Sequence, residues 1–292
     1  MNKLLLALAA CAAFALPAGT HAQAPPTPSA QNPVREITQI AGEVYRFRNN
    51  NHYSIFVVTS AGIIATDPIN AAAATWLKDE LKKRWPDRPI KYVVYSHDHN
   101  DHIAGGEVWA DTAIVVAHQD AKVAIVGEKR PTAVPQVTFT ERMTIELGGT
   151  VMELYWVGRN HSNNSVVMRL PREKIAFAVD FIPVRAVTFR DLPDAYVDEW
   201  IESLKRVEAM EFDIFVPGHG PLGNKTDVVN FRGYMEDLRA QVLAAARAGK
   251  TLEETKQLVD LSKYKSWGGF EQMSQLNIEG MFRLVQQNRR PN

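Results

Sequence analysis

Residues 97–102 constrain the fold of this chain more than any other feature. They read His97-Asp98-His99-Asn100-Asp101-His102, so three imidazoles and two carboxylates lie within six residues. Imidazole nitrogen is a preferred zinc ligand, and a carboxylate can complete a second site. In an extended loop, His97 and His99 project to the same side and can reach one ion, while Asp101 and His102 can face a second ion. A solvated polar turn is the alternative, but the whole chain has only eight histidines.

Short β-rich runs and helical patterns alternate along the chain, and they predict two α/β layers packed sheet to sheet. The expected strands cover residues 44–47, 54–58, 62–66, 91–95, 113–117, 150–157, 166–170, 175–179 and 213–216. The strands 166–170 and 175–179 are expected to form a hairpin. Expected helices or helical turns cover 71–84, 103–110, 119–126, 196–207, 228–242 and a segment starting at the capping box of Thr251.

Three later residues become candidate ligands because each follows a predicted strand, as the first cluster does. His161 lies in a polar loop, Asp180 ends a strand, and His219 stands in a Gly-His-Gly turn. Taken alone, each of them is more often a turn or capping residue. The carboxyl edge of a sheet is where loops converge and ligands collect, so together they indicate one site.

The ordered set His97, His99, Asp101, His102, His161, Asp180 and His219 resembles the signature of the metallo-β-lactamase superfamily. The resemblance implies an α+β fold, a four-layer αββα sandwich of two mixed β-sheets flanked by helices. It also implies two zinc ions. His97, His99 and His161 would hold the first, Asp101, His102 and His219 the second, and Asp180 would bridge the pair. Asp67, after an early strand, would orient a ligand imidazole from behind.

The resemblance further implies a zinc-dependent hydrolase that cleaves an acyl bond of a lactone, ester, thioester or amide. Two zinc ions about 3.5–4 Å apart supply a bridging hydroxide as nucleophile and polarise a carbonyl oxygen. Asp101 and Asp180 are the candidate catalytic carboxylates, with Asp101 placed to take a proton.

Efficient β-lactam cleavage is the first alternative, and the sequence speaks against it at two positions. Related β-lactamases place a lysine three residues after the bridging position, where this chain has Pro183, and Arg185 is the candidate substitute. Asp191 stands where those enzymes have a substrate-binding asparagine, and it would repel an anionic drug if it faced the pocket. His52, Tyr53 and Asn164 are further candidates for substrate contact, and His118 is expected to cap a helix rather than bind metal.

Two other classes stay open. An iron-dependent oxidoreductase of the same fold would use a similar ligand set, and metal analysis separates it from a zinc enzyme. A binding protein of the cell envelope with a vestigial site is the other class, against which the complete ligand set speaks. The formal net charge is zero, without a basic stripe, so we expect a small-molecule substrate and no nucleic acid. The oligomeric state is not fixed by the sequence.

The N-terminal segment reads as an export signal. A positive start at Lys3 precedes an apolar run up to Leu16, and small residues then allow cleavage before Gln23. Residues 1–22 are therefore the expected signal peptide, 23–35 a Pro-rich disordered tether and 36–292 the domain, in a periplasmic or secreted protein. A lipoprotein cut at Cys11, the only cysteine, is the minor alternative. No second run is long enough to span a membrane.

Overall fold

The computed structural model describes residues 32–287 of the chain, and contacts group the described residues from Pro33 onward into one compact unit. Residues 1–22, with Cys11, and most of the predicted tether lie outside the described part. The first strand begins at Arg35, one residue inside the segment expected to be a tether. Within the described residues, no helix is both long and apolar enough to cross a membrane.

The described strands form two sheets. The first has the order β1-β2-β3-β4-β5-β6-β7. Its strands are Arg35–Ala41 (β1), Val44–Asn49 (β2), His52–Thr59 (β3), Gly62–Thr66 (β4), Ile90–Val94 (β5), Ile114–His118 (β6) and Val137–Phe139 (β7). Pairing is antiparallel from β1 to β4 and parallel from β4 to β7, so the sheet is mixed.

The second sheet has the order β12-β11-β10-β9-β8. Its strands are Arg142–Leu147 (β8), Thr150–Trp156 (β9), Val166–Leu170 (β10), Ile175–Ala178 (β11) and Ile214–Pro217 (β12). Only β11 and β12 pair in parallel, and β10 and β11 form the predicted hairpin.

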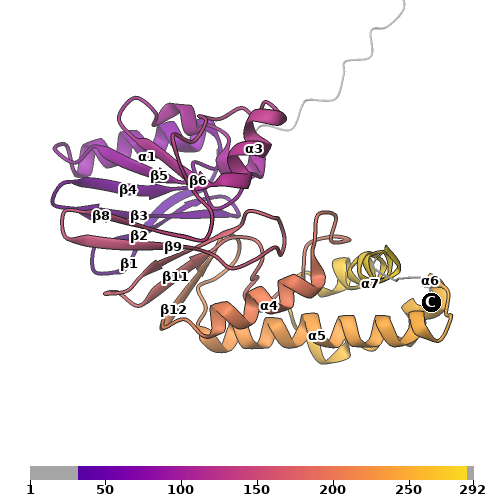
Figure 1. Ribbon diagram of the computed structural model, residues 1–292. Helices are drawn as coiled ribbons and strands as arrows, with labels where there is room; N and C mark the ends of the chain where they lie inside the picture. Colours follow the sequence, from indigo (N-terminus) through magenta and orange to yellow (C-terminus); the bar gives the residue numbers. More distant parts are fainter. Residues whose placement is uncertain (1–31, 288–292) are drawn as a thin grey trace, which may run out of the picture. The chain divides into compact units, whose positions relative to one another are not determined.

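Helices cover the outer faces of both sheets (Figure 1). On the first sheet lie Ala71–Arg84 (α1), Asn100–Ile103 (α2), the 3₁₀ turn Gly106–Val108 (η1) and Gln119–Gly127 (α3). On the second lie Val197–Glu208 (α4) and Lys225–Arg247 (α5). Beyond them follow Leu252–Leu258 (α6), the 3₁₀ turn Ser262–Tyr264 (η2) and Phe270–Gln287 (α7), with α6 and α7 packed against α5. The expected αββα sandwich is therefore confirmed.

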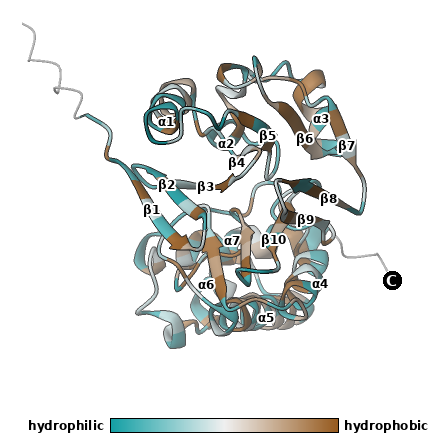
Figure 2. Ribbon diagram, turned by 90° about the vertical axis from the view of Figure 1, so that its left-hand side faces the viewer, coloured by the Kyte–Doolittle hydropathy of each residue, from teal (hydrophilic) through white to brown (hydrophobic). Residues whose placement is uncertain are grey.

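Three hydrophobic clusters fill the three interfaces between these layers. One joins α1 and α3 to the first sheet, through residues such as Leu77 and Ile125. A second lies between the sheets, where Ile64 of β4 and Phe177 of β11 are both fully buried. The third packs α4, α5 and α7 on the second sheet. The brown, hydrophobic ribbon segments of the strands lie inside the sandwich in Figure 2. Burial on both faces explains why β3, β4 and β11 read as continuous apolar runs.

Five elements were missed by the sequence patterns, namely β1, β7, β8, α7 and the 3₁₀ turn η2. The three strands lie at sheet edges or next to them and bury few side chains, so their hydrophobic alternation is weak. Helix α7 contains Asn277 and Gly280, which are poor helix formers, and only the tertiary structure shows their purpose, because both contact the backbone of residues 188–191.

Candidate metal centre

The seven predicted ligands come together in two groups that share Asp180. His97, His99, His161 and Asp180 form one group, and Asp101, His102, Asp180 and His219 form the other. In each group, one ligand atom per residue lies within 4.8 Å of every other. Asp180 is central, because its carboxylate lies 3.2 Å from Nε2 of His102, 3.4 Å from Nε2 of His97 and 3.1 Å from Nε2 of His219.

Strand ends deliver these residues to one edge of the sandwich. His97 follows β5, Asp180 follows β11, and His219 follows β12. Asp180 has a left-handed backbone, with φ 64°, which costs free energy for a residue other than glycine. Gly218 lets β12 approach closely, since a Cβ there would lie 2.4 Å from Val179 Cγ1. The local chain geometry thus turns the Asp180 carboxylate toward both groups of imidazoles.

Hydrogen bonds behind the histidines orient their rings. Nδ1 of His219 donates to the carbonyl oxygen of Asn51 at 2.8 Å, which leaves Nε2 with its lone pair toward Asp180. Nδ1 of His97 lies 2.9 Å from Oγ of Ser96. Hydrogen-bond partners of this kind fix the orientation and the tautomer of a metal-binding imidazole. Asn51 and Ser96 were not predicted, since a carbonyl and a lone hydroxyl leave no signal in a sequence.

Asp67 has the position that the resemblance implied. It is fully buried, and its Oδ1 accepts the Ser96 N–H at 2.8 Å. Its Oδ2 lies 3.4 Å from Nδ1 of His102, which is also fully buried. Asp67 therefore supports the His102 ring from the side opposite Asp180.

The pKa values of these groups follow from burial and from each other's charge. Burial would raise the pKa of Asp180, but the imidazoles of His102, His219 and His97 outweigh it and hold that pKa well below its usual range. Burial would lower the pKa of His102, but the carboxylates of Asp180 and Asp67 raise it well above its usual value. Burial lowers the pKa of His161 to about 3. A proton on His102 thus balances Asp180 where no cation is bound, and a metal ion can replace that proton.

Unpaired atoms show that the donors fit metal ions. Nε2 of His97 and Oδ1 of Asp180 are buried without a hydrogen-bond partner. Nδ1 of His99 and Nε2 of His161, two potential lone-pair nitrogens, lie 3.1 Å apart. Buried polar atoms normally have partners, and a cation between these nitrogen and oxygen donors would satisfy them together. The Asp101 carboxylate is half-exposed and completes the second group, 3.6 Å from Nε2 of His102.

Of the candidate substrate residues His52, Tyr53 and Arg185, only two line the cavity beside the metal centre. His52 lines a cavity beside the metal centre, and its Nε2 lies 3.2 Å from Oδ2 of Asp101. Arg185 also lines this cavity, with Nε 3.4 Å from Oδ1 of Asp227. Tyr53 does not line it, and its ring is covered by the guanidinium of Arg46, 3.6 Å from the ring centre.

Asn164 has a different role from the predicted substrate contact. It is 1 % exposed, and its amide nitrogen donates to Oδ1 of Asp98 at 2.8 Å. Its amide oxygen accepts the Asp98 N–H at 3.0 Å. Both ends of the side chain are therefore used to hold the loop that carries His97 and His99.

Asp191 does not face the cavity, so it is not placed to repel an anionic substrate. Its carboxylate lies 3.6 Å from a guanidinium nitrogen of Arg283, and it is not among the lining residues. Asp194 lines the cavity instead, with Oδ2 3.8 Å from Nε2 of His99. His118 caps α3 as predicted, by accepting the Asp120 N–H.

A buried carboxylate ringed by imidazoles at the carboxyl edge of an αββα sandwich defines a protein with a candidate two-metal site. Residues 66–219, just over half of the chain, match the metallo-beta-lactamase superfamily. The chain belongs to this superfamily, whose members are generally hydrolases with a metal site.

Known proteins with similar sequences differ in their activities. The alpha subunit of 2,4-dinitroanisole O-demethylase from Nocardioides sp. (strain JS1661) is 23 % identical over 62 % of this chain, which spans only 56 % of that subunit. A type 2 metallo-beta-lactamase from Bacteroides fragilis is 26 % identical over 64 % of this chain and 80 % of its own length.

Solved structures share the fold at low sequence identity. A metallo-beta-lactamase from Pontibacter korlensis has a TM-score of 0.62 at 23 % identity, covering 70 % of this chain and 99 % of its own. The DIM-1 metallo-beta-lactamase has a TM-score of 0.61 at 20 % identity, covering 69 % of this chain and 97 % of its own. These structural similarities support the fold and identify no substrate for this chain.

Proposed function

We propose that the protein is an exported dinuclear zinc hydrolase that cleaves the acyl bond of a lactone, ester, thioester or amide. The observation that carries the proposal is the pair of donor groups that share the buried Asp180 carboxylate. When bound there, two zinc ions would supply a Lewis acid and a water of lowered pKa. His97, His99, His161 and Asp180 would hold one ion, and Asp101, His102, Asp180 and His219 the other.

Asp101 is the group placed to hold or accept a proton from an attacking water. Partial burial would raise the pKa of Asp101, but the hydrogen bond from His52 and the charge on His102 hold that pKa below its usual value. The carboxylate is therefore ionised and oriented by His52. Because its side chain is 54 % exposed, it can reach a molecule that enters from the cavity.

Efficient β-lactam cleavage is the second candidate, favoured by the type 2 metallo-beta-lactamases among the relatives. Such a substrate carries a carboxylate, which needs a cation in the site. Among the cavity-lining residues within 32–287, Arg185 is the only Lys or Arg, and Asp227 already contacts it. We therefore expect β-lactam turnover to be weaker than that of uncharged carbonyl substrates.

Metal analysis and kinetics test this function together. Protein purified without added metal should contain close to two zinc equivalents, and chelation should abolish hydrolysis reversibly. Initial rates should be compared for lactones, esters, thioesters, amides, penicillins, cephalosporins, carbapenems and an aryl methyl ether, the last because of the demethylase relative. A single redox-active iron would contradict the hydrolase, and kcat/KM near about 10⁵ M⁻¹s⁻¹ for β-lactams alone would favour the second candidate.

Export is tested separately, because the predicted signal peptide lies outside the described residues. N-terminal sequencing of the mature protein should find Gln23 or a neighbour. An intact Met1 in a cytoplasmic fraction would contradict export, and a lipid on Cys11 would support the lipoprotein alternative.

A further inference from the structure

A cavity of about 780 Å³ opens beside the metal centre and reaches far beyond it. The metal-centre residues Asp101, His161, Asp180 and His219 form only part of the wall. Most of the remaining wall comes from the loop 182–195, and part of it comes from residues 268–273, before and at the start of α7. This volume is in the range of pockets that enclose a small organic molecule.

Uncharged side chains dominate this wall away from the metal centre. The apolar lining residues include Ile182, Val184, Val187, Phe189, Leu192, Trp200 and Met273. Arg185 is directed partly to Asp227, and the carboxylate of Asp194 is 63 % exposed near the His99 side. An apolar group that enters this cavity therefore binds with favourable free energy because it leaves water. An anionic group would be repelled by the carboxylate of Asp194.

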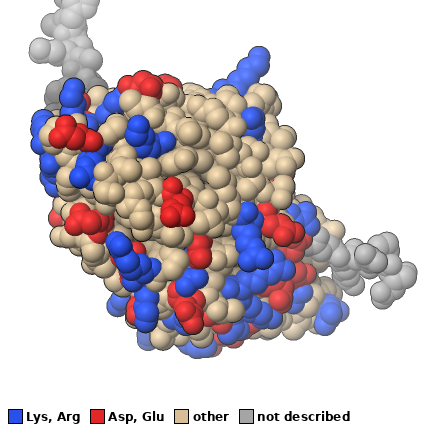
Figure 3. Space-filling view, turned by 60° about the vertical axis from the view of Figure 1, so that its left-hand side comes forward, with Lys and Arg blue, Asp and Glu red and all other residues tan. Residues whose placement is uncertain are grey.

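On the face in Figure 3, uncharged residues cover a broad area of the upper middle and right, and Lys, Arg, Asp and Glu side chains gather mainly at the left edge and in the lower half. Phe189, in the loop 182–195, is 69 % exposed and is one of the residues that line the cavity.

Residues 268–277 hold the loop 182–195, called the cavity loop below, in place. The Val187 N–H donates to the carbonyl of Gly268 at 3.1 Å, and the Gly268 N–H donates to the carbonyl of Arg185 at 2.9 Å. The buried amide of Asn277 donates to the carbonyls of Thr188 and Arg190. Gly268 and Asn277 lie outside residues 66–219, the part that matches the superfamily, whereas the loop that they hold lies inside it. The wall is therefore pre-formed by a segment that the superfamily match does not include.

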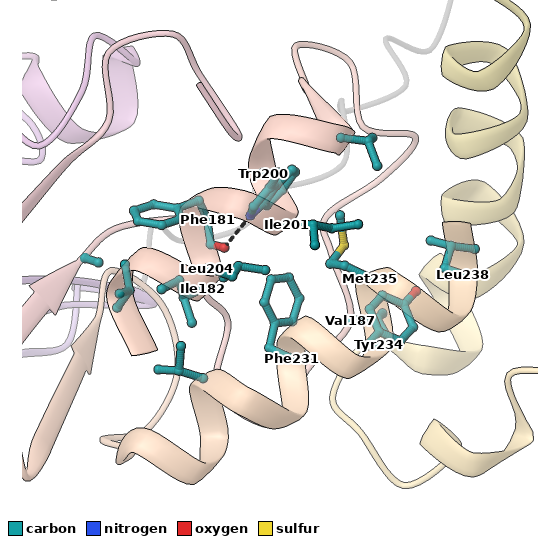
Figure 4. Packing of buried hydrophobic residues seen from close by; sticks show 14 of the residues in the cluster. Phe181, Ile182, Val187, Trp200, Ile201, Leu204, Phe231, Tyr234, Met235 and Leu238 are labelled. Atoms are coloured by element: carbon teal, nitrogen blue, oxygen red, sulfur yellow. Dashed lines mark hydrogen bonds between the residues drawn. The ribbon is translucent and has the colours of Figure 1, made fainter. Parts of the chain in front are cut away.

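Trp200, another residue of the cavity wall, is also fixed. Trp200 of α4 donates its indole N–H to the carbonyl of Phe181 at 2.8 Å, as the dashed line in Figure 4 shows. Its ring packs near Phe231 of α5, with 6.2 Å between ring centres, and is 2 % exposed. A rigid aromatic wall gives an apolar ligand a contact surface without an ordering cost.

We propose that this cavity binds an uncharged alkyl or aryl substituent of the carbonyl substrate, and that Met273 and the loop 182–195 select for it. The part of this assignment that concerns a carbonyl substrate rests on the proposed function, but the binding of an apolar group to the cavity does not. Each methylene that leaves water for such a cavity should raise kcat/KM about fourfold until the cavity is filled.

Substrates of graded length and three variants test the assignment. The zinc-loaded full chain is assayed with p-nitrophenyl acetate, butyrate, hexanoate and octanoate. Met273→Trp should narrow the cavity and reduce the gain in kcat/KM for the longer chains, relative to acetate measured with the same variant. Leu276→Trp is the matched control, since this residue is on the same helix but is 38 % exposed and outside the cavity. Met273→Lys should reverse the preference toward acyl chains that end in a carboxylate.

A binding measurement makes the test independent of catalysis. The neutral fluorescent probe N-phenyl-1-naphthylamine is titrated into the metal-free wild type and the variants. It should bind the wild type and Leu276→Trp alike, and Met273→Trp at least tenfold more weakly. A kcat/KM that does not change with chain length would overturn the assignment. If no carbonyl compound is hydrolysed, the proposed function fails, and the probe then decides: loss in Met273→Trp alone supports the apolar site, and equal binding to all variants overturns it.

Discussion

Asp67 is a buried carboxylate that contacts the candidate metal centre without belonging to either donor group. It contacts His102 at Nδ1 and the Ser96 N–H, and has no exposed surface. Asp67→Asn keeps an oxygen for the Ser96 N–H but removes the negative charge beside His102. We expect zinc affinity to fall by about 10–100-fold, since this is the usual effect of losing such support.

A competition titration with a chromophoric chelator measures this affinity. Asp227→Asn is a suitable control, because Asp227 is also a buried carboxylate but caps α5, away from the metal centre. It should lower the free energy of unfolding and leave zinc affinity unchanged. Equal zinc affinity in wild type and Asp67→Asn would show that Asp67 only supports the fold.

His118 links the stability of the first sheet to pH. Its Nε2 donates to the Thr140 carbonyl and its Nδ1 accepts the Asp120 N–H, so the hydrogen bonds fit the neutral ring. Burial lowers its pKa below the usual value. The unfolded chain therefore binds the proton more readily, and the stabilisation is complete above the unfolded pKa of about 6.5 and is lost as pH falls through the folded pKa.

His118→Asn tests this linkage, since asparagine is a good N-cap that does not titrate. Urea unfolding of both proteins should be followed between pH 5 and 8 in a chelator. We expect the free energy of unfolding of wild type, relative to the variant, to decrease toward pH 5. Taking the difference cancels the metal-centre histidines, which both proteins share. A pH-independent difference would mean that the ring is not held in its neutral form.

At the scale of elements, α7 is held against the cavity loop by a close approach at Gly280. A Cβ at this position would lie 1.9 Å from the carbonyl oxygen of Asp191. Gly280→Ala should therefore lower the free energy of unfolding by about 1–3 kcal/mol, because the loop or the helix must move. In an ordinary helix the same change would raise it by about 1 kcal/mol.

Gly233→Ala in α5 is the matched control. A Cβ there would meet only the Tyr264 hydroxyl, at 3.9 Å, so alanine should stabilise the protein. Thermal or urea unfolding gives the stability of each variant, and kcat/KM for long and short esters shows whether the loop has moved. Stabilisation by both substitutions would contradict the close packing of α7 on residues 185–192.

At the scale of the whole molecule, the metal centre joins the two sheets, since its ligands follow strands of both. Metal ions that bind only the folded state should therefore stabilise the entire sandwich. At a free metal concentration of about 1,000 times Kd the gain is about 4 kcal/mol, or about 8–16 °C in Tm. Differential scanning calorimetry with and without a chelator measures it.

Asp180→Ala provides the internal control for this experiment. Because Asp180 belongs to both donor groups, its loss should remove most of the metal-dependent increase in Tm, together with the hydrolytic activity. A Tm that does not respond to chelation in the wild type would contradict metal binding by the folded chain.

The sequence alone determined the candidate ligands, their order and the sandwich around them. Six residues, 97–102, contain four of the seven donors, and the remaining three each follow a predicted strand. Strand ends in such a fold converge at one edge, so a local pattern carried global information. The continuous apolar strands likewise indicated sheets buried on both faces, because burial acts on every residue of such a strand.

Only the tertiary structure decided which side chains face the substrate. Asp191 and Asp194 stand three residues apart on one loop, yet Arg283 of α7 turns the first away while the second lines the cavity. Asn164 looked like a pocket residue and instead holds Asp98. Met273, far along the chain, forms part of the wall. These outcomes depend on contacts between distant segments, which no local periodicity or motif encodes.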